Sequence, residues 1–386
     1  MAGAFLLSSC SYDETVESYK GNGISFRTFT DNVTRSTAIN DASGLTDFKV
    51  AAYKDADKSL YFKDTWTKAT DAGTNSWNCS NIYYWPGDNS AQLNFSAYGP
   101  VANINGGTET FDGTSNKITG ISPAVNAKDQ TELLVAYNTG TGASSQAGVN
   151  MQFKHIFSQI VVQAKNASNV HRIEVKGVKL GHLHSTADLT MPSASTDNND
   201  LLQRNTIWGN LSPATGGNWD AGKNSYVSKA IADNTNMSAD YTSLMGTDNS
   251  FIVIPQNMTA WTQTADNDGA YISVLCRIWQ KTGNGADEIL LYPSDGTKWG
   301  WAAVGIAPDW NPGYKYTYNL SFFDGENGGA GTVDPDPTDP DPTDPTVPID
   351  PTPNPGDPVV GGAIKINVTV DTWEDATPQP GDIVMK

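Results

Sequence analysis

Apolar and polar residues alternate along most of this chain. Segments 48–53, 92–98 and 133–137 are examples, and each is bordered by Gly, Pro, Asn or Asp. A period of two sends successive side chains to opposite faces of a strand, and the bordering residue types favour turns. No long stretch has the spacing of an amphipathic helix. The sequence therefore predicts an all-β fold.

The same pattern continues through the second half of the chain. The apolar phase shifts around Gly177, as a β-bulge would produce. Residues 191–247 are rich in Ser, Asn, Asp and Thr, which predicts a long loop within this half. The expected later strands lie at 149–164, 173–180, 251–254, 272–279, 289–292 and 314–320.

A boundary near Gly148 divides the strands into two comparable groups, each large enough for a β-sandwich domain. We therefore expect five regions along the chain. They are an N-terminal remnant and linker at 1–20, a first sandwich at 21–148, a second at 149–325, an Asp/Pro-rich spacer at 326–362 and a C-terminal strand region at 363–386.

The segment 334–358 consists largely of alternating Asp and Pro. Proline fixes the backbone angle φ and the aspartates repel one another, so we expect an extended, solvated polyproline-II spacer. A calcium site would need oxygen ligands folded around one point, which alternating Pro resists. Beyond this segment, four apolar residues share one face of a predicted strand that must dock on a sheet, its own or a neighbour's. They are Ile364, Ile366, Val368 and Val370.

The net charge of -18 argues against nucleic-acid binding, because a phosphate backbone requires clustered Lys and Arg. The first apolar stretch ends in Leu-Ser-Ser-Cys at Cys10, which resembles a bacterial lipobox in which the cysteine carries lipid. The alternative is an ordinary start segment with an incidental cysteine. Cys79 and Cys276 are the remaining cysteines, and the sequence does not establish whether they pair.

No motif for catalysis or for a bound cofactor is evident. His182 and His184 are spaced to share one face of a strand, but no Cys or carboxylate completes a metal-ligand pattern. We therefore expect no enzyme, no metal and no cofactor. The alternative to a structural role is a monomeric glycan-binding lipoprotein, in which exposed Trp and Tyr stack on sugar rings. The tryptophans that suggested it are Trp66, Trp77, Trp85, Trp299, Trp301 and Trp310.

Several of these segments, in order, resemble the fimbrillin and Mfa-like pilins of Bacteroidetes. The Tyr-Trp-Pro and Phe-Lys-His motifs contribute most to the resemblance. It covers most of the chain, through segments 7–10, 26–35, 45–53, 82–86, 93–100, 153–162, 314–320 and 364–373.

The resemblance implies two transthyretin-like β-sandwich domains and export as a lipoprotein to the outer membrane and cell surface. It implies a pilus subunit that polymerises by strand exchange and supports adhesion. The implied partners are other copies of this chain or related pilins, an Arg-specific maturation protease, and a host or bacterial surface glycan or protein.

The family's processing also implies roles for individual residues. Lipid would be carried by Cys10, and the protease would cut after Arg35, before Ser36. The strand removed would include Ile24, Phe26 and Phe29. The strand donated to a neighbour would be Ile364 to Val370 or the residues that follow Trp373, and a C-terminal donor favours a stalk subunit over a tip.

Overall fold

Strands dominate the computed structural model of this chain. In the described residues there are one four-residue helix, α1 (Arg204–Ile207), and three short 3-10 turns, η1 (Val101–Asn103), η2 (Ala127–Asp129) and η3 (Gly246–Asp248). The structure describes residues 23–30, 45–69, 77–113, 115–193, 195–196, 202–213, 225–229, 235–248, 250–262, 269–283, 288–341 and 343–373. In this part of the chain no helix has the length and apolar character needed to cross a membrane.

The first sheet holds the N-terminal strand at one edge. That strand, β1, runs parallel to β9, while the other neighbours in the sheet are antiparallel. In spatial order the strands are β1 (Phe26–Thr30), β9 (Val149–His155), β8 (Leu134–Gly140), β5 (Leu93–Gly99), β2 (Asp47–Lys54), β3 (Leu60–Lys68) and β4 (Trp77–Asn78).

A small fourth sheet covers one face of the first. Tyr98 of β5 and Ile118 and Leu189 of the fourth sheet belong to one buried cluster between the two sheets. The order of the fourth sheet is β13 (Trp208–Ser212), β12 (Thr186–Thr190), β7 (Asn116–Ile121) and β6 (Thr108–Phe111).

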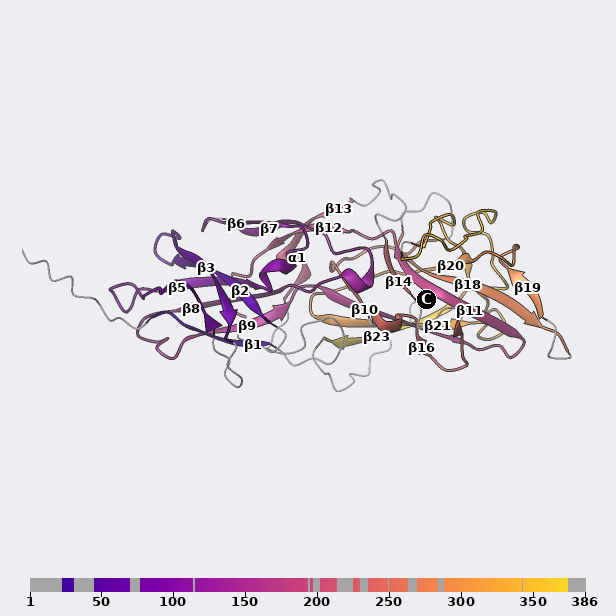
Figure 1. The fold of residues 1–386 in the computed structure, drawn as a ribbon, viewed down its shortest axis with the longest axis horizontal. Helices are drawn as coiled ribbons and strands as arrows, with labels where there is room; N and C mark the ends of the chain where they lie inside the picture. Colours follow the sequence, from indigo (N-terminus) through magenta and orange to yellow (C-terminus); the bar gives the residue numbers. More distant parts are fainter. Residues whose placement is uncertain are drawn as a thin grey trace, which may run out of the picture.

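The second and third sheets form a sandwich at the opposite end of an elongated molecule (Figure 1). The second is ordered β16 (Thr242–Ser243), β10 (Ser158–Asn166), β21 (Tyr314–Phe322) and β23 (Lys365–Thr372), with β17 (Phe251–Val253) also on β10. The third is ordered β14 (Tyr226–Lys229), β11 (His171–Gly181), β18 (Tyr271–Lys281), β20 (Gly300–Gly305) and β22 (Thr332–Val333), with β15 (Thr235–Asn236) on β11 and β19 (Glu288–Tyr292) on β18.

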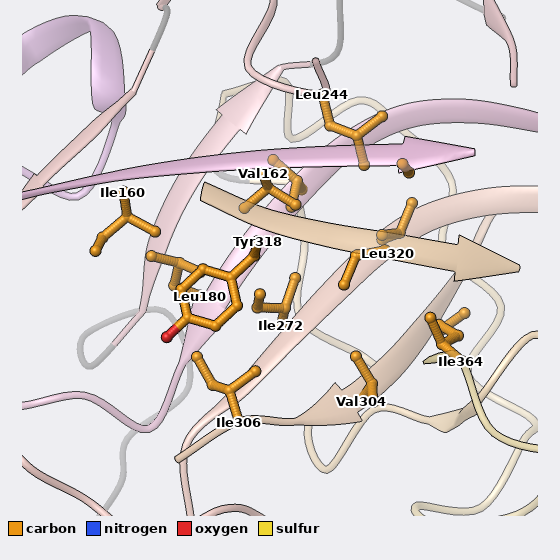
Figure 2. Close-up of a cluster of buried hydrophobic side chains, with 14 of the residues drawn as sticks. Ile160, Val162, Leu180, Leu244, Ile272, Val304, Ile306, Tyr318, Leu320 and Ile364 are labelled. Carbon is orange, nitrogen blue, oxygen red and sulfur yellow. The ribbon is translucent and has the colours of Figure 1, made fainter. Parts of the chain in front are cut away.

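The largest core lies between the second and third sheets (Figure 2). Val162 and Tyr318 from the second sheet point toward Leu180 and Ile272 from the third. All four are buried, as the period-two pattern requires of inward positions. The fold is therefore an all-β sandwich, as the sequence predicts.

The expected bulge in the strand at 173–180 is confirmed. The register between β11 and β18 shifts between Val175 and Gly177. Before the shift Val175 faces the core, and after it Val178 and Leu180 do. The extra residue thus keeps the apolar face inward across the phase change.

The boundary expected near Gly148 falls within the first sheet, because β9 begins at Val149 and pairs with β1 and β8. The strand β12, from the expected second domain, likewise pairs with β7 from the first. The domain limits remain a proposal. Within 191–247, the predicted long loop, the structure has α1 and the short strands β13 to β16. These strands pair at the edges of the fourth, third and second sheets.

The prediction of an extended, solvated Asp/Pro spacer is wrong. The segment folds back over the outer face of the third sheet, where Val347 packs with Leu275, Trp299 and Trp301 (gold, near β20 in Figure 1). Its aspartates bind their own backbone: the Asp341 carboxylate accepts bonds from the Thr343 amide and hydroxyl, and the two later Asp-Pro-Thr triplets repeat this turn. Local hydrogen bonds and apolar burial thus stabilise a folded segment and outweigh the repulsion between its aspartates.

Truncating Ile272 to alanine tests the sandwich core. The side chain is fully buried between the second and third sheets, so Ile272→Ala is expected to lower the free energy of unfolding by about 2–5 kcal/mol. Denaturant unfolding measures this loss. The matched control, Ile289→Ala, removes an exposed side chain from β19 and should change the free energy by less than about 0.5 kcal/mol. Equal effects of the two substitutions would contradict this core.

Candidate functional site

The strand β1 joins the first sheet as an edge strand from the N-terminal part of the chain. Its backbone pairs in parallel with β9, from Phe26 opposite Val149 to Thr30 opposite Phe153. Ile24, Phe26 and Thr28 are buried. Ser25 and Arg27, which alternate with them, are exposed. The strand therefore fills an apolar groove with every second side chain.

Phe26 occupies the centre of this groove. Its ring meets those of Trp66, Phe95 and Phe48 edge to face, with centroid distances of 4.9, 5.5 and 6.0 Å. Edge-to-face pairs contribute roughly 0.5–1.5 kcal/mol each beyond the burial of area. Losing β1 would leave three large aromatic side chains facing an empty groove.

The first sheet curls so that its two edge strands meet. The Trp77 indole on β4 donates a hydrogen bond of 2.8 Å to the hydroxyl of Thr28 on β1. This bond satisfies two polar groups inside an otherwise apolar cluster. The contact makes β1 the closing element between β9 and β4.

A loop at 79–85 holds the start of β1. The Tyr83 carbonyl accepts a 2.7 Å hydrogen bond from the Ile24 amide, and Gly23 forms an antiparallel bridge with Tyr84. The Tyr83 ring stacks on Phe62 at 4.2 Å. The entry of the chain into the groove is thus fixed by backbone contacts as well as by apolar packing.

The carboxylate of Asp64 orders this loop. It accepts hydrogen bonds from the Asn81 amide at 2.7 Å and the Tyr83 hydroxyl at 2.8 Å. The bond from Asn81, the largest cause, lowers the pKa of Asp64 to about 2. The ionised carboxylate therefore stabilises the loop that holds β1.

The proposed donor strand lies in its own sheet in this structure. Residues Lys365–Thr372 form β23, which pairs antiparallel with β21. Ile364 and Val368 are buried in the large core, and Ile366 and Val370 pack against it. The strand is followed by Trp373, whose ring stacks on His155 of β9 at 4.5 Å and whose amide donates to the Gly313 carbonyl at 2.7 Å.

The structure brings together only some of the residues predicted for the site. Ile24 and Phe26 lie in the groove, and the backbone of Phe29 pairs opposite Gln152 while its side chain is outside the described residues. Sequence reasoning missed Thr28, the next inward position after Phe26, although period two from Ile24 could have identified it. The lipidation and cleavage residues Cys10, Arg35 and Ser36 lie outside the described residues.

Cysteine and histidine chemistry adds no site here. Cys79 and Cys276 are free thiols in different cores, and burial raises the pKa of the Cys276 thiol. His182 and His184 lie beyond the end of β11, where the His182 ring contacts Asp336 at 3.2 Å. In the part of the chain that the structure describes, no group of three or more His, Cys, Asp or Glu is placed to hold a metal ion.

The tryptophans that suggested glycan stacking are not exposed. Trp77 is half-buried, and its indole bonds to Thr28. The other five are buried in cores: Trp66, Trp85, Trp299, Trp301 and Trp310. The glycan-binding alternative therefore loses these six tryptophans as exposed stacking surfaces.

Comparison with known proteins gives a family match. The sequence profile of the fimbrillin-like family matches residues 34–335. No curated protein sequence matches the chain. The solved structures that it resembles include candidate cell adhesion proteins from Bacteroides ovatus (16% identity, TM-score 0.38, 78% of this chain and 92% of that chain) and Parabacteroides distasonis (9%, 0.46, 93% and 99%), and a fimbrial assembly protein from Parabacteroides distasonis (9%, 0.38, 92% and 97%).

Truncating Phe26 tests the packing of β1. Phe26→Ala removes the ring at the centre of the groove and should lower the free energy of unfolding by about 3–5 kcal/mol. The matched control is Arg27→Ala on the exposed face of the same strand, which should change it by less than about 0.5 kcal/mol. Denaturant unfolding of the untrimmed chain compares the two. A loss no larger for Phe26→Ala than for the control would mean that β1 does not contribute to the core.

Acid should destabilise the loop at 79–85 that holds β1, because protonation of Asp64 weakens its hydrogen bonds to that loop. Its pKa is lower in the folded chain than its ordinary value of 3.8, so its contribution is present above that value and is lost as the pH falls toward about 2. Asp64→Asn should therefore flatten the decline of stability between about pH 4 and 2, as measured by acid titration with denaturant. Asp129→Asn, at the distant turn η2, is the control and should keep the slope of the wild type. An unchanged slope in Asp64→Asn would exclude this role.

Proposed function

This chain belongs to the fimbrillin-like family, and we propose that it is a structural subunit of an adhesive pilus that polymerises by strand exchange. The observation that carries the proposal is the position of β1, a short N-terminal strand that fills an apolar groove at the edge of the first sheet. A strand in this place can be removed without opening another sheet. Membership of this family also agrees with a chain that is not an enzyme.

Removal of β1 would create a specific binding site. The edge of β9 would present unpaired N–H and C=O groups, and Phe48, Trp66 and Phe95 would line the open groove. A sheet edge with such groups is a template for an incoming strand, and pockets for alternate side chains select its sequence. The occupant we propose is a strand from another copy of this chain or from a related pilin.

We assign the cut to the bond between Arg35 and Ser36, within the segment that joins β1 to β2. Arg27 is a poorer site because it lies inside β1 and its backbone pairs with Asn150. Cleavage after Arg35 by an Arg-specific protease would free β1 from the rest of the sheet. Lipidation of Cys10 would place the uncut chain at the outer membrane, and the cut would separate the subunit from that anchor.

Two C-terminal segments are candidates for the donated strand. The first is β23 with Ile364, whose withdrawal would expose Val368 and the edge of β21 at a cost of about 1.5–3 kcal/mol for each fully buried apolar side chain. The second is 374–386, which follows Trp373 and contains an Ile-Val-Met run. Because β23 and Trp373 stabilise the subunit itself, we favour 374–386 as the donor.

A protease assay tests the proposal. The purified chain is treated with an Arg-specific protease, and boiled and unboiled samples are compared on a denaturing gel. We expect trimming at Arg35 followed by a ladder of oligomers that collapses on boiling. Arg35→Ala should give neither trimming nor a ladder, while the control Arg27→Lys should behave like the wild type. A ladder of equal strength in Arg35→Ala would contradict assembly by removal of β1.

Shortening the chain identifies the donor. A chain that ends at Trp373 should still be trimmed at Arg35 but should form no ladder, because its groove stays intact and its donor is missing. Persistence of the ladder in this chain would assign donation to β23 instead. Mixing the shortened chain with the full chain provides the control, since an intact groove should cap the growing polymers.

A further inference from the structure

A buried lysine lies between two aspartates on the outer face of the third sheet. Lys179 of β11 is 1% exposed, and Asp334 and Asp339 are 0% and 4% exposed. The Lys179 Nζ atom lies 3.2 Å from Asp334 and 3.0 Å from Oδ2 of Asp339. The first carboxylate follows β22 directly, and the second belongs to the Asp/Pro segment that covers the sheet. Residues 155 and 160 positions apart thus meet in a closed site.

Aromatic rings surround the Lys179 amine and shield it from water. The Lys179 amine lies 4.8 Å from the ring centroid of Trp301 and 5.5 Å from that of Tyr271. The Trp301 indole donates a 3.0 Å hydrogen bond to the Asp339 carbonyl, which fixes the backbone of the covering segment. Small residues make room for the lysine, because Ser273 lies beside it in the sheet and Ala303 lies beside Ser273. Water has little access to the three charged groups.

Such a cluster is costly while its groups stay charged. Transfer of an ammonium and a carboxylate from water into a protein interior costs several kcal/mol for each ion, and their attraction does not always repay it. One lysine faces two carboxylates here, so the cluster has an excess of negative charge unless one carboxyl group holds a proton. Burial raises the pKa of Asp339, so its carboxylate accepts a proton from the ammonium group more readily than an exposed carboxylate would.

The Lys179 amine and the Asp334 carboxyl group are close enough to react with each other. Both carboxylate oxygens of Asp334 lie 3.2 Å from the amine, so Nζ is equidistant from them and adjacent to the carboxyl group that contains Cγ. The Asp334 side chain is held in place, because its Oδ1 also accepts a 2.8 Å hydrogen bond from the Asp336 amide. Groups held at such distances in a dry site react as if at very high concentration.

We propose that Lys179 and Asp334 condense spontaneously to an intramolecular isopeptide bond, with Asp339 as the group that transfers protons. The nitrogen Nζ attacks Cγ of Asp334, and the new N–C bond replaces one Cγ–O bond. The departing oxygen leaves as water with two protons from the ammonium group, one of which passes through the Asp339 carboxyl. One positive and one negative charge disappear, and no oxidant, metal or cofactor is consumed.

The protonation states set the order of these events. Burial lowers the pKa of Lys179, but the nearby Asp334 and Asp339 carboxylates outweigh it and raise that pKa. The amine must therefore pass a proton to a carboxyl group before it can attack, and Asp339 stands at 3.0 Å to receive it. After condensation the amide N–H can still donate to the same oxygen of Asp339. The product is a covalent tie between β11 and the end of β22.

Mass spectrometry of the denatured full chain tests the proposal. The wild type should be lighter by one water than its otherwise identical reference Lys179→Arg, after correction for the substitution itself. Trypsin should fail to cut after Lys179 and should yield the segment 177–204 joined to 316–365. Cleavage after the equally buried Lys154 is the internal control for complete digestion. A wild-type mass without this loss, with 316–365 recovered free, would overturn the proposal and leave an ordinary buried ion pair.

Two further variants test the assigned roles. Asp334→Asn keeps an acceptor carbon but changes the leaving group, so its cross-linked form should be lighter by ammonia instead of water. Asp339→Asn removes the proton carrier and should leave most of the chain uncross-linked, although both bonded residues remain. Loss of water in Asp334→Asn would assign the bond to another carboxyl group, and full cross-linking in Asp339→Asn would exclude that residue from proton transfer. Circular dichroism of each variant establishes that it is folded.

Discussion

The parallel contact between β1 and β9 is the constraint on which the first sheet depends. It closes a curled sheet by filling the gap between β9 and β4, with Phe26 against Trp66 and Thr28 bonded to Trp77. The same contact is local to an edge, so it can be lost without separating any other pair of strands. A strand that is needed for closure but easily separated is suited to replacement by a strand of another subunit.

The first and last strands of the structure, β1 and β23, pack on their sheets in different ways. At the N-terminal end, one strand inserts three side chains into a groove. It is held there by its pairing with β9, the loop around Tyr83 and the hydrogen bond from Trp77 to Thr28. Near the C-terminal end, β23 adds a strand to the second sheet, and Trp373 packs on His155 of β9. This difference is why we place the acceptor at β1 and the donor beyond Trp373.

Sequence alternation predicted most strands of the large sheets, because the inward faces of β2, β5, β18 and β21 are apolar at every second position. The family resemblance, and not the alternation, placed Ile24 and Phe26 in the N-terminal strand. The alternation did not predict the folded Asp/Pro segment, since the partner that stabilises it, Lys179, lies 155 residues away from Asp334. The parallel pairing of β1 with β9 could not be predicted either, because the alternation within one strand does not determine which strand it pairs with.

Amide hydrogen exchange at β9 tests the central claim most directly, when it is followed through the intact, trimmed and assembled protein. The account predicts protection of the β9 amides that face β1 in the intact chain, loss of that protection in the trimmed monomer, and its return in the polymer. Amides of β18, in the middle of the third sheet, should stay protected throughout. Unchanged protection of β9 in the trimmed monomer, or no return of protection on assembly, would contradict replacement of β1 by a strand from another subunit.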